Sequence, residues 1–113
     1  MSKRTDAQRV AESLTHLDAL HRHLSRHDLP DSTVADAVSM RLSAAIEALQ
    51  HDHPSLGQRL FGEQWRQIWG TRNYIAHGYA FIDFATIADT VKNNLPEFER
   101  VLREELEHLG KDS

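Results

Sequence analysis

The stretch VADAVSMRLSAAIEAL, residues 34–49, has the apolar spacing of an amphipathic helix. Its apolar residues recur every three or four positions, which places them on one helix face. They are Val34, Val38, Leu42, Ala45, Ile46 and Leu49. Asp31 or Ser32 is expected to cap the start of this helix, and the polar stretch before Pro54 is expected to end it. The pattern predicts a helix with one buried face.

A similar pattern precedes this stretch. The apolar positions there are Val10, Leu14, Leu17, Leu20 and Leu24. Thr5 and Gln8 have the spacing of a capping box at the start of a helix. The helix is expected to end near His27–Pro30, because a residue before proline disfavours helical geometry.

The pattern also continues toward the C-terminus. Ser55–Gly62 is expected to be a single turn or a loop, and a third helix is expected from about Glu63 to His77. A fourth helix is expected after Asp83, with Pro96 bending it rather than ending it. Its apolar positions are Ile87, Val91, Leu95, Phe98, Leu102 and Leu106. Because no alternating strand pattern occurs, the sequence predicts an all-α, four-to-five-helix bundle forming a single domain over residues 1–113.

The composition is that of a globular protein. Of the 113 residues, 40% are apolar and 27% are charged. The absence of cysteine excludes disulfides and thiolate metal sites. No signal peptide or membrane-spanning stretch is recognised, so a cytoplasmic protein is expected. The net charge of −4 argues against a surface that holds long nucleic acids, but not against a nuclease that contacts a short piece of RNA.

The residues best suited to chemistry are Arg72 and His77, at the end of the third predicted helix. A five-residue step turns a helix by about 500° and rises about 7.5 Å, so the two side chains do not stack on one face. Gly78 is expected to end the helix and to leave His77 in its last turn. Within one helix the pair can converge only through the length of the arginine and fraying of the helix end.

Arginine and histidine together are suited to metal-independent cleavage of RNA. A ribose 2′-hydroxyl that attacks the adjacent phosphate must lose a proton, and histidine can take it. The arginine fork can stabilise charge on the phosphoryl oxygens. Spacing alone leaves an alternative open, in which Arg72 forms a surface salt bridge and His77 caps the helix.

Two other groups of residues allow a functional interpretation. His23 and His27 are four residues apart and could share one helix face with metal-ligand spacing, although solvated surface is favoured and no metal site is predicted. Trp65 and Trp69 could stack on bases, but a place in the core or in a dimer interface is favoured.

The segment Arg72-Asn73-Tyr74-Ile75-Ala76-His77-Gly78-Tyr79 resembles the Arg-x4-His-x-Tyr signature of HepT-type proteins of the HEPN class. The run Trp65-Arg66-Gln67-Ile68 before it is similar to the family's Trp-Arg-x-Ile run. Asn94-Leu95-Pro96-Glu97, with Asp83 and Ile87 ahead of it, resembles the family's last helix. Motif, flanks and helix order agree over most of the chain.

The resemblance implies a homodimeric HEPN bundle that acts as a metal-independent ribonuclease toxin, with no cofactor and with tRNA as the suggested substrate. It implies that Arg72 and His77 of both copies line one catalytic cleft, and it makes Asn73 a weaker candidate for that cleft. The implied antitoxin is a minimal nucleotidyltransferase of the MntA type, which attaches AMP to the motif tyrosine, here Tyr79.

One departure from the family concerns the second predicted helix, where Ile46-Glu47-Ala48 stands in place of a frequent Gly-Glu-Ala step. This implies different local packing. The alternative function is a non-catalytic helical partner of a nucleotidyltransferase, for which the motif is a binding and modification site. Toxicity on expression without the partner separates the two hypotheses.

Overall fold

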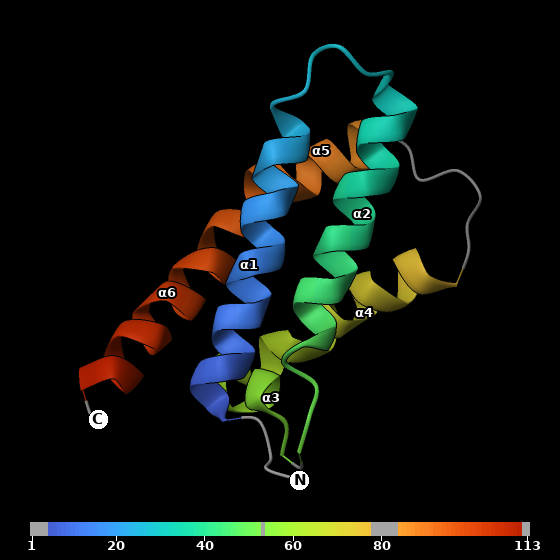
Figure 1. Cartoon of the computed structure of the whole chain (residues 1–113). Helices are drawn as coiled ribbons and strands as arrows, with labels where there is room; N and C mark the ends of the chain where they lie inside the picture. Colours follow the sequence, from blue (N-terminus) through green and yellow to red (C-terminus); the bar gives the residue numbers. More distant parts are fainter. Residues whose placement is uncertain (1–4, 53, 78–83, 112–113) are drawn as a thin grey trace, which may run out of the picture.

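The computed structural model describes residues 5–52, 54–77 and 84–111, and their regular structure is entirely helical (Figure 1). The predicted all-α class is therefore confirmed. In this part of the chain no helix is long and apolar enough to span a membrane. The elements are α1 (Asp6–Leu24), α2 (Asp31–Glu47), α3 (Leu56–Phe61), the 3-10 turn η1 (Gly62–Gln64), α4 (Trp65–Ala76), α5 (Phe84–Asn93) and α6 (Leu95–Lys111).

Helices α1 and α2 form an antiparallel pair to which the other helices are added (Figure 1). The predicted capping box is present at the start of α1: the Gln8 amide donates to Thr5 Oγ1 at 3.1 Å, and the Thr5 amide donates to Gln8 Oε1 at 2.8 Å. Between the helices, the buried Ser13 hydroxyl donates to the Ala45 carbonyl at 2.8 Å. This bond fixes the register of α1 against α2.

The start of α2 differs from the prediction. Pro30 occupies the N-cap position, and no side chain caps the helix. The Pro30 carbonyl instead accepts from the amides of Thr33 and Val34 at 3.0 and 3.1 Å. The expectation that Asp31 or Ser32 caps α2 was therefore wrong: Asp31 is already the first helical residue, where a carboxylate favours the positive end of the helix dipole.

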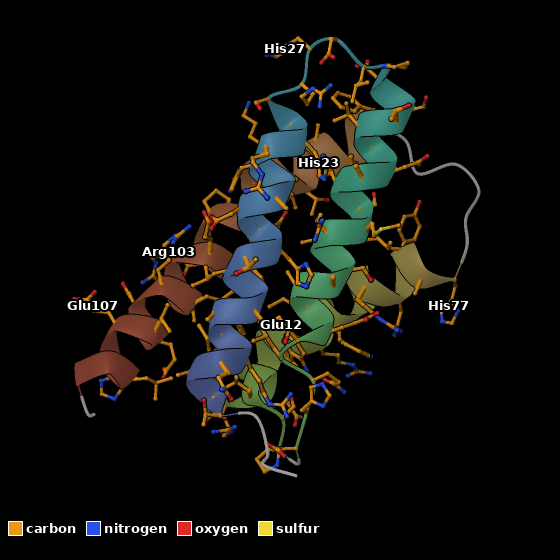
Figure 2. The ribbon with its side chains drawn as sticks, in the orientation of Figure 1. Glu12, His23, His27, His77, Arg103 and Glu107 are labelled. Carbon is orange, nitrogen blue, oxygen red and sulfur yellow. The ribbon has the colours of Figure 1, made fainter. Side chains whose placement is uncertain are left out.

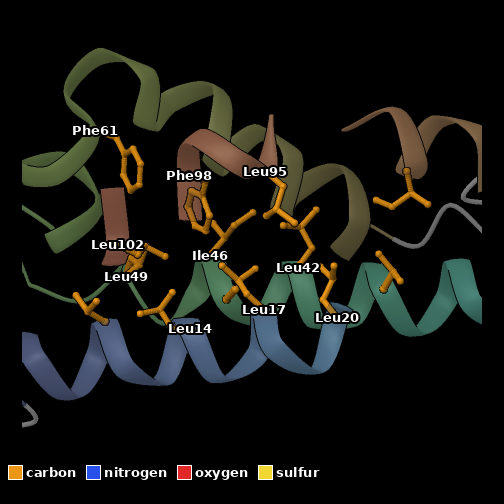
Figure 3. Close-up of a cluster of buried hydrophobic side chains, with 14 of the residues drawn as sticks. Leu14, Leu17, Leu20, Leu42, Ile46, Leu49, Phe61, Leu95, Phe98 and Leu102 are labelled. Atoms are coloured by element: carbon orange, nitrogen blue, oxygen red, sulfur yellow. The ribbon is translucent and has the colours of Figure 1, made fainter. Parts of the chain in front are cut away.

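The hydrophobic core lies between α1, α2 and α6 (Figure 3). Leu14, Leu17 and Leu20 of α1 face the buried side chains of α2. Leu95, Phe98 and Leu102 of α6 close the core on the other side. The apolar faces predicted from sequence for these helices supply most of this core.

Two boundaries were predicted wrongly. The segment expected to be a turn or loop contains α3, which begins with a second capping box formed by Ser55 and Gln58. The helix expected to bend at Pro96 is instead two helices, α5 and α6, separated at Asn94. Pro96 lies in the first turn of α6, where its missing amide hydrogen removes no helical hydrogen bond. Asp83, the expected cap of α5, lies outside the described residues.

Candidate functional site

The motif residues lie in the C-terminal half of α4, which crosses α2 and packs against it (Figure 1). Trp65, at the start of α4, anchors the helix in the core: its side chain is buried, and its indole N–H donates to Gln50 Oε1 at 3.0 Å. From this anchor the helix continues through Arg72 and Asn73 to its C-cap at His77.

Arg72 has three neighbours that fix its guanidinium group. Its Nε donates to Glu47 Oε1, at the end of α2, over 2.8 Å. Its Nη1 donates to Asn73 Oδ1 over 3.2 Å. The guanidinium carbon lies 4.8 Å from the centre of the Trp69 ring, in a cation–π contact. Among the described residues no bond from Nη2 is recorded.

His77 occupies the C-cap position of α4, and its backbone amide donates to the Asn73 carbonyl over 3.0 Å. Its side chain is exposed and extends from the free end of the helix (Figure 2). No hydrogen bond joins Arg72 to His77 among the described contacts. This agrees with the helical spacing, which separates the two side chains along one copy of α4.

Asn73 connects the two motif residues. Its side chain accepts from Arg72, and its backbone carbonyl accepts from the amide of His77. Asn73 was the weaker candidate from sequence, and the structure places it between the stronger two. Its side chain is oriented by the arginine and is half-buried.

An open groove of about 380 Å³ lies between α2 and the end of α4, beside Arg72. Its lining residues are Asp36, Ser39, Met40, Ser43, Ala44, Glu47 and Ile75. Met40, which lines the groove, is 72% exposed, and Tyr74 of the neighbouring helix α4 is 48% exposed. The Ser39 hydroxyl is buried and has no hydrogen-bond partner among the described residues. Such a face is typical of a surface that is covered in an assembly.

A family model described as Ribonuclease HepT-like matches residues 10–105. The chain belongs to the HepT-like ribonuclease family. The match extends from α1 into α6 and includes the whole motif helix α4. It confirms the resemblance seen in the sequence and identifies the chain as a ribonuclease at the level of the family. No solved structure matches the chain.

The sequence prediction missed one residue of this HepT-like ribonuclease that contacts the motif. Glu47 was noted only within the step where Ile46 departs from the family pattern, yet its carboxylate binds Arg72. No local signal marks it, because 25 positions separate the two residues along the chain.

The remaining predictions for the ribonuclease have mixed outcomes. Tyr79 and Gly78 lie outside the described residues.

Because α1 ends at Leu24, His27 is not helical, and the suggestion that it shares a helix face with His23 was wrong. Within the described part of the chain no group of three His, Asp or Glu side chains is placed to hold a metal ion. The burial of Trp65 confirms its predicted core role, while Trp69 is half-buried and supports Arg72.

Proposed function

We propose that two copies of this HepT-like ribonuclease form a cleft in which Arg72 and His77 cleave RNA without a metal ion. The observation that carries the proposal is the state of Arg72: Glu47 binds its Nε, Trp69 covers one face, and among the described residues no bond to its Nη2 is recorded. An arginine held in this way is suited to binding a phosphate.

The reaction follows from these two side chain types. One histidine removes the proton of a ribose 2′-hydroxyl, and the oxygen attacks the adjacent phosphorus. Arg72 binds the non-bridging oxygens, where negative charge develops. The bond from phosphorus to the 5′-oxygen breaks, and a second, protonated histidine gives that oxygen a proton. The products are a 2′,3′-cyclic phosphate and a free 5′-hydroxyl.

The need for two histidines supports a dimer. One copy supplies a single motif histidine, at the exposed end of α4 and without a bond to Arg72. A twofold axis beside the groove brings the same surface of two copies together, so that each copy contributes the same residues. The exposed Met40 gives this face apolar area to bury.

The family suggests tRNA as the substrate, and the acidic net charge of the chain favours contact with a short piece of RNA over binding along an extended basic surface.

We further propose that an MntA-type nucleotidyltransferase is the antitoxin and attaches AMP to Tyr79. A phosphate added beside the cleft repels the RNA backbone. Both parts of this proposal rest on the resemblance of the motif to its family.

The test of the nuclease is cleavage of labelled tRNA by purified protein in excess EDTA, followed by analysis of the new ends. Arg72→Ala and His77→Ala are expected to abolish cleavage and growth inhibition while the circular dichroism spectrum stays unchanged. A wild-type dimer that cleaves no RNA and is harmless when expressed alone contradicts the proposal. That outcome favours the non-catalytic partner of a nucleotidyltransferase.

The test of the modification is intact-mass measurement after co-expression with the nucleotidyltransferase. The mass is expected to increase by one or more AMP units. Tyr79→Phe is expected to remove the increase, whereas Tyr74→Phe keeps it. An unmodified wild-type protein that is nevertheless neutralised by its partner contradicts AMP transfer as the mechanism.

A further inference from the structure

We propose that Glu47 is a positioning residue of the ribonuclease, and that its carboxylate fixes the direction in which Arg72 presents its guanidinium group to the phosphate. The inference rests on the proposed function of Arg72. It assigns to the end of α2 a role in catalysis that the Arg-x4-His motif does not contain.

The contacts of Arg72 come from two helices. Trp69 and Asn73 belong to α4, as Arg72 itself does, and they move with it. Glu47 belongs to α2 and holds Nε over 2.8 Å. It is therefore the contact that ties the guanidinium to the bundle rather than to its own helix.

The nitrogen of Arg72 that Glu47 binds determines which N–H groups of the guanidinium can face a phosphate. An arginine has five N–H donors in a planar fork. Glu47 binds Nε and Asn73 binds one N–H of Nη1, so among the described contacts both N–H groups of Nη2 and one of Nη1 have no recorded bond. These N–H groups can donate to the oxygens of one phosphate. The arrangement exists before substrate binds, so no reorientation is needed during the reaction.

The ion pair between Glu47 and Arg72 is expected to orient the guanidinium group more than it stabilises the fold. The Glu47 side chain is 46% exposed and that of Arg72 is 27% exposed, so water screens their attraction. Pairs of this kind contribute little to folding. Loss of Glu47 is therefore expected to change activity much more than the urea midpoint of unfolding.

A competing effect has the opposite sign. If the carboxylate acted mainly by neutralising the positive charge of Arg72, its removal would strengthen phosphate binding and raise activity. The direction of the change therefore decides between a positioning residue and an inhibitory one.

The first experiment compares steady-state kinetics of Glu47→Ala, Glu47→Gln and wild type on the same labelled RNA. For Glu47→Ala we expect kcat to fall by about tenfold or more, as for other small misplacements of catalytic groups, with a smaller change in KM. Glu47→Gln is expected to recover most of the rate, because its amide oxygen still accepts from Nε. The matched control is Glu104→Ala, since Glu104 also pairs with an arginine, Arg100, over 2.7 Å but lies on α6. It is expected to match wild type.

The second experiment does not depend on activity. In a 15N-labelled protein the Arg72 Nε–H signal, assigned with Arg72→Lys, is expected to exchange slowly with water. We expect Glu47→Ala to broaden or remove this signal and Glu104→Ala to leave it unchanged. Sedimentation velocity of each variant shows whether the oligomeric state is preserved, because Glu47 also lines the groove beside α4.

The outcomes separate the two proposals. A wild-type protein without ribonuclease activity contradicts the proposed function, and the Nε–H signal then still tests the contact itself. Active wild type with an equally active or more active Glu47→Ala variant overturns the positioning role. A loss of activity in Glu47→Ala that is explained by dissociation of the dimer also overturns the positioning role. An equally large loss of activity in Glu47→Gln overturns it as well.

Discussion

At the scale of single residues, the state of Arg72 is the feature that gives the motif its chemical meaning. Sequence spacing alone allowed a surface salt bridge, and the structure does contain one, with Glu47. The two interpretations are compatible, because the ion pair uses Nε, whereas the proposed phosphate contact uses Nη2, for which the described residues show no bond. A residue can therefore be structurally bound and still be available for catalysis.

Lysine is expected to be a poor substitute at this position. Arg72→Lys keeps the positive charge but has one nitrogen, which cannot bind Glu47 and a phosphate with the same geometry. We expect kcat to fall by about 10²-fold, a loss comparable to removal of one transition-state donor. The control is Arg66→Lys, an exposed position on the same helix, where wild-type kinetics are expected. Equal activity of Arg72→Lys and wild type contradicts bidentate binding.

A second residue-scale prediction concerns the loop between α1 and α2. Hydrogen bonds from Arg26 over 2.8 Å lower the pKa of Asp28 from 3.8 to about 2. Because the folded pKa is below the unfolded one, the pair's contribution to stability is present above about pH 4 and is lost as the pH falls toward 2. We expect an NMR titration of the Asp28 carboxyl carbon to give a midpoint of about 2. Arg26→Ala is expected to raise this midpoint; an unchanged midpoint contradicts the ion pair.

At the scale of helices, the apolar periodicity predicted α1 and α2, because each buries one continuous face. Helix α4 was predicted over nearly its full length, although Trp65 is its one buried residue. The periodicity failed at Asn94 because the apolar spacing continues across the break between α5 and α6. It also missed α3, although Ser55 and Gln58 repeat the capping-box spacing of Thr5 and Gln8. The capping-box spacing is as clear at Ser55 as at Thr5. However, α3 has six residues, which is too short for an apolar periodicity to confirm a helix.

The junction of α3 and α4 gives a prediction about stability. A Cβ atom at Gly57 would lie 2.4 Å from Trp65 Cε2, within a buried ring that cannot move easily. We expect Gly57→Ala to lower the free energy of unfolding by about 1–3 kcal/mol, the usual cost of overpacking. The matched control is Gly70→Ala in α4, where a Cβ atom meets nothing within 4 Å. It is expected to raise stability by about 0.5–1 kcal/mol. Urea unfolding of both variants measures the contrast, and equal midpoints contradict the packing argument.

At the scale of the whole molecule, the site could be predicted from sequence only in part. The motif named Arg72, Asn73 and His77, but the contact that holds Arg72 against α2 is made between helices. The partner of Arg72 on α2 and the groove beside it depend on how α4 crosses α2, which no local pattern records. The departure at Ile46 is accommodated because this side chain is buried in the core instead of lying on the groove face.

The groove face also gives a prediction about assembly. Met40 is the most exposed large apolar side chain on it, and a charge there cannot be buried without cost. We expect Met40→Asp to shift the monomer–dimer equilibrium, measured by sedimentation, toward the monomer. RNA cleavage is expected to fall in proportion to the loss of dimer, and the helical content is expected to stay unchanged. Ala11→Asp, on the exposed surface of α1, is expected to keep the dimer. A Met40→Asp variant that remains dimeric and active places the interface elsewhere.

The bond between Glu47 and Arg72 also has a consequence for how this sequence can change over generations. Two positions that are 25 residues apart are joined by one ion pair, so a mutation at either is expected to alter what is tolerated at the other. In a descendant protein that has lost the arginine, an acidic residue at the end of α2 no longer has this guanidinium group to bind. The pair is therefore expected to be inherited and lost together, and an acidic residue at this position would mark the descendants that still cut RNA.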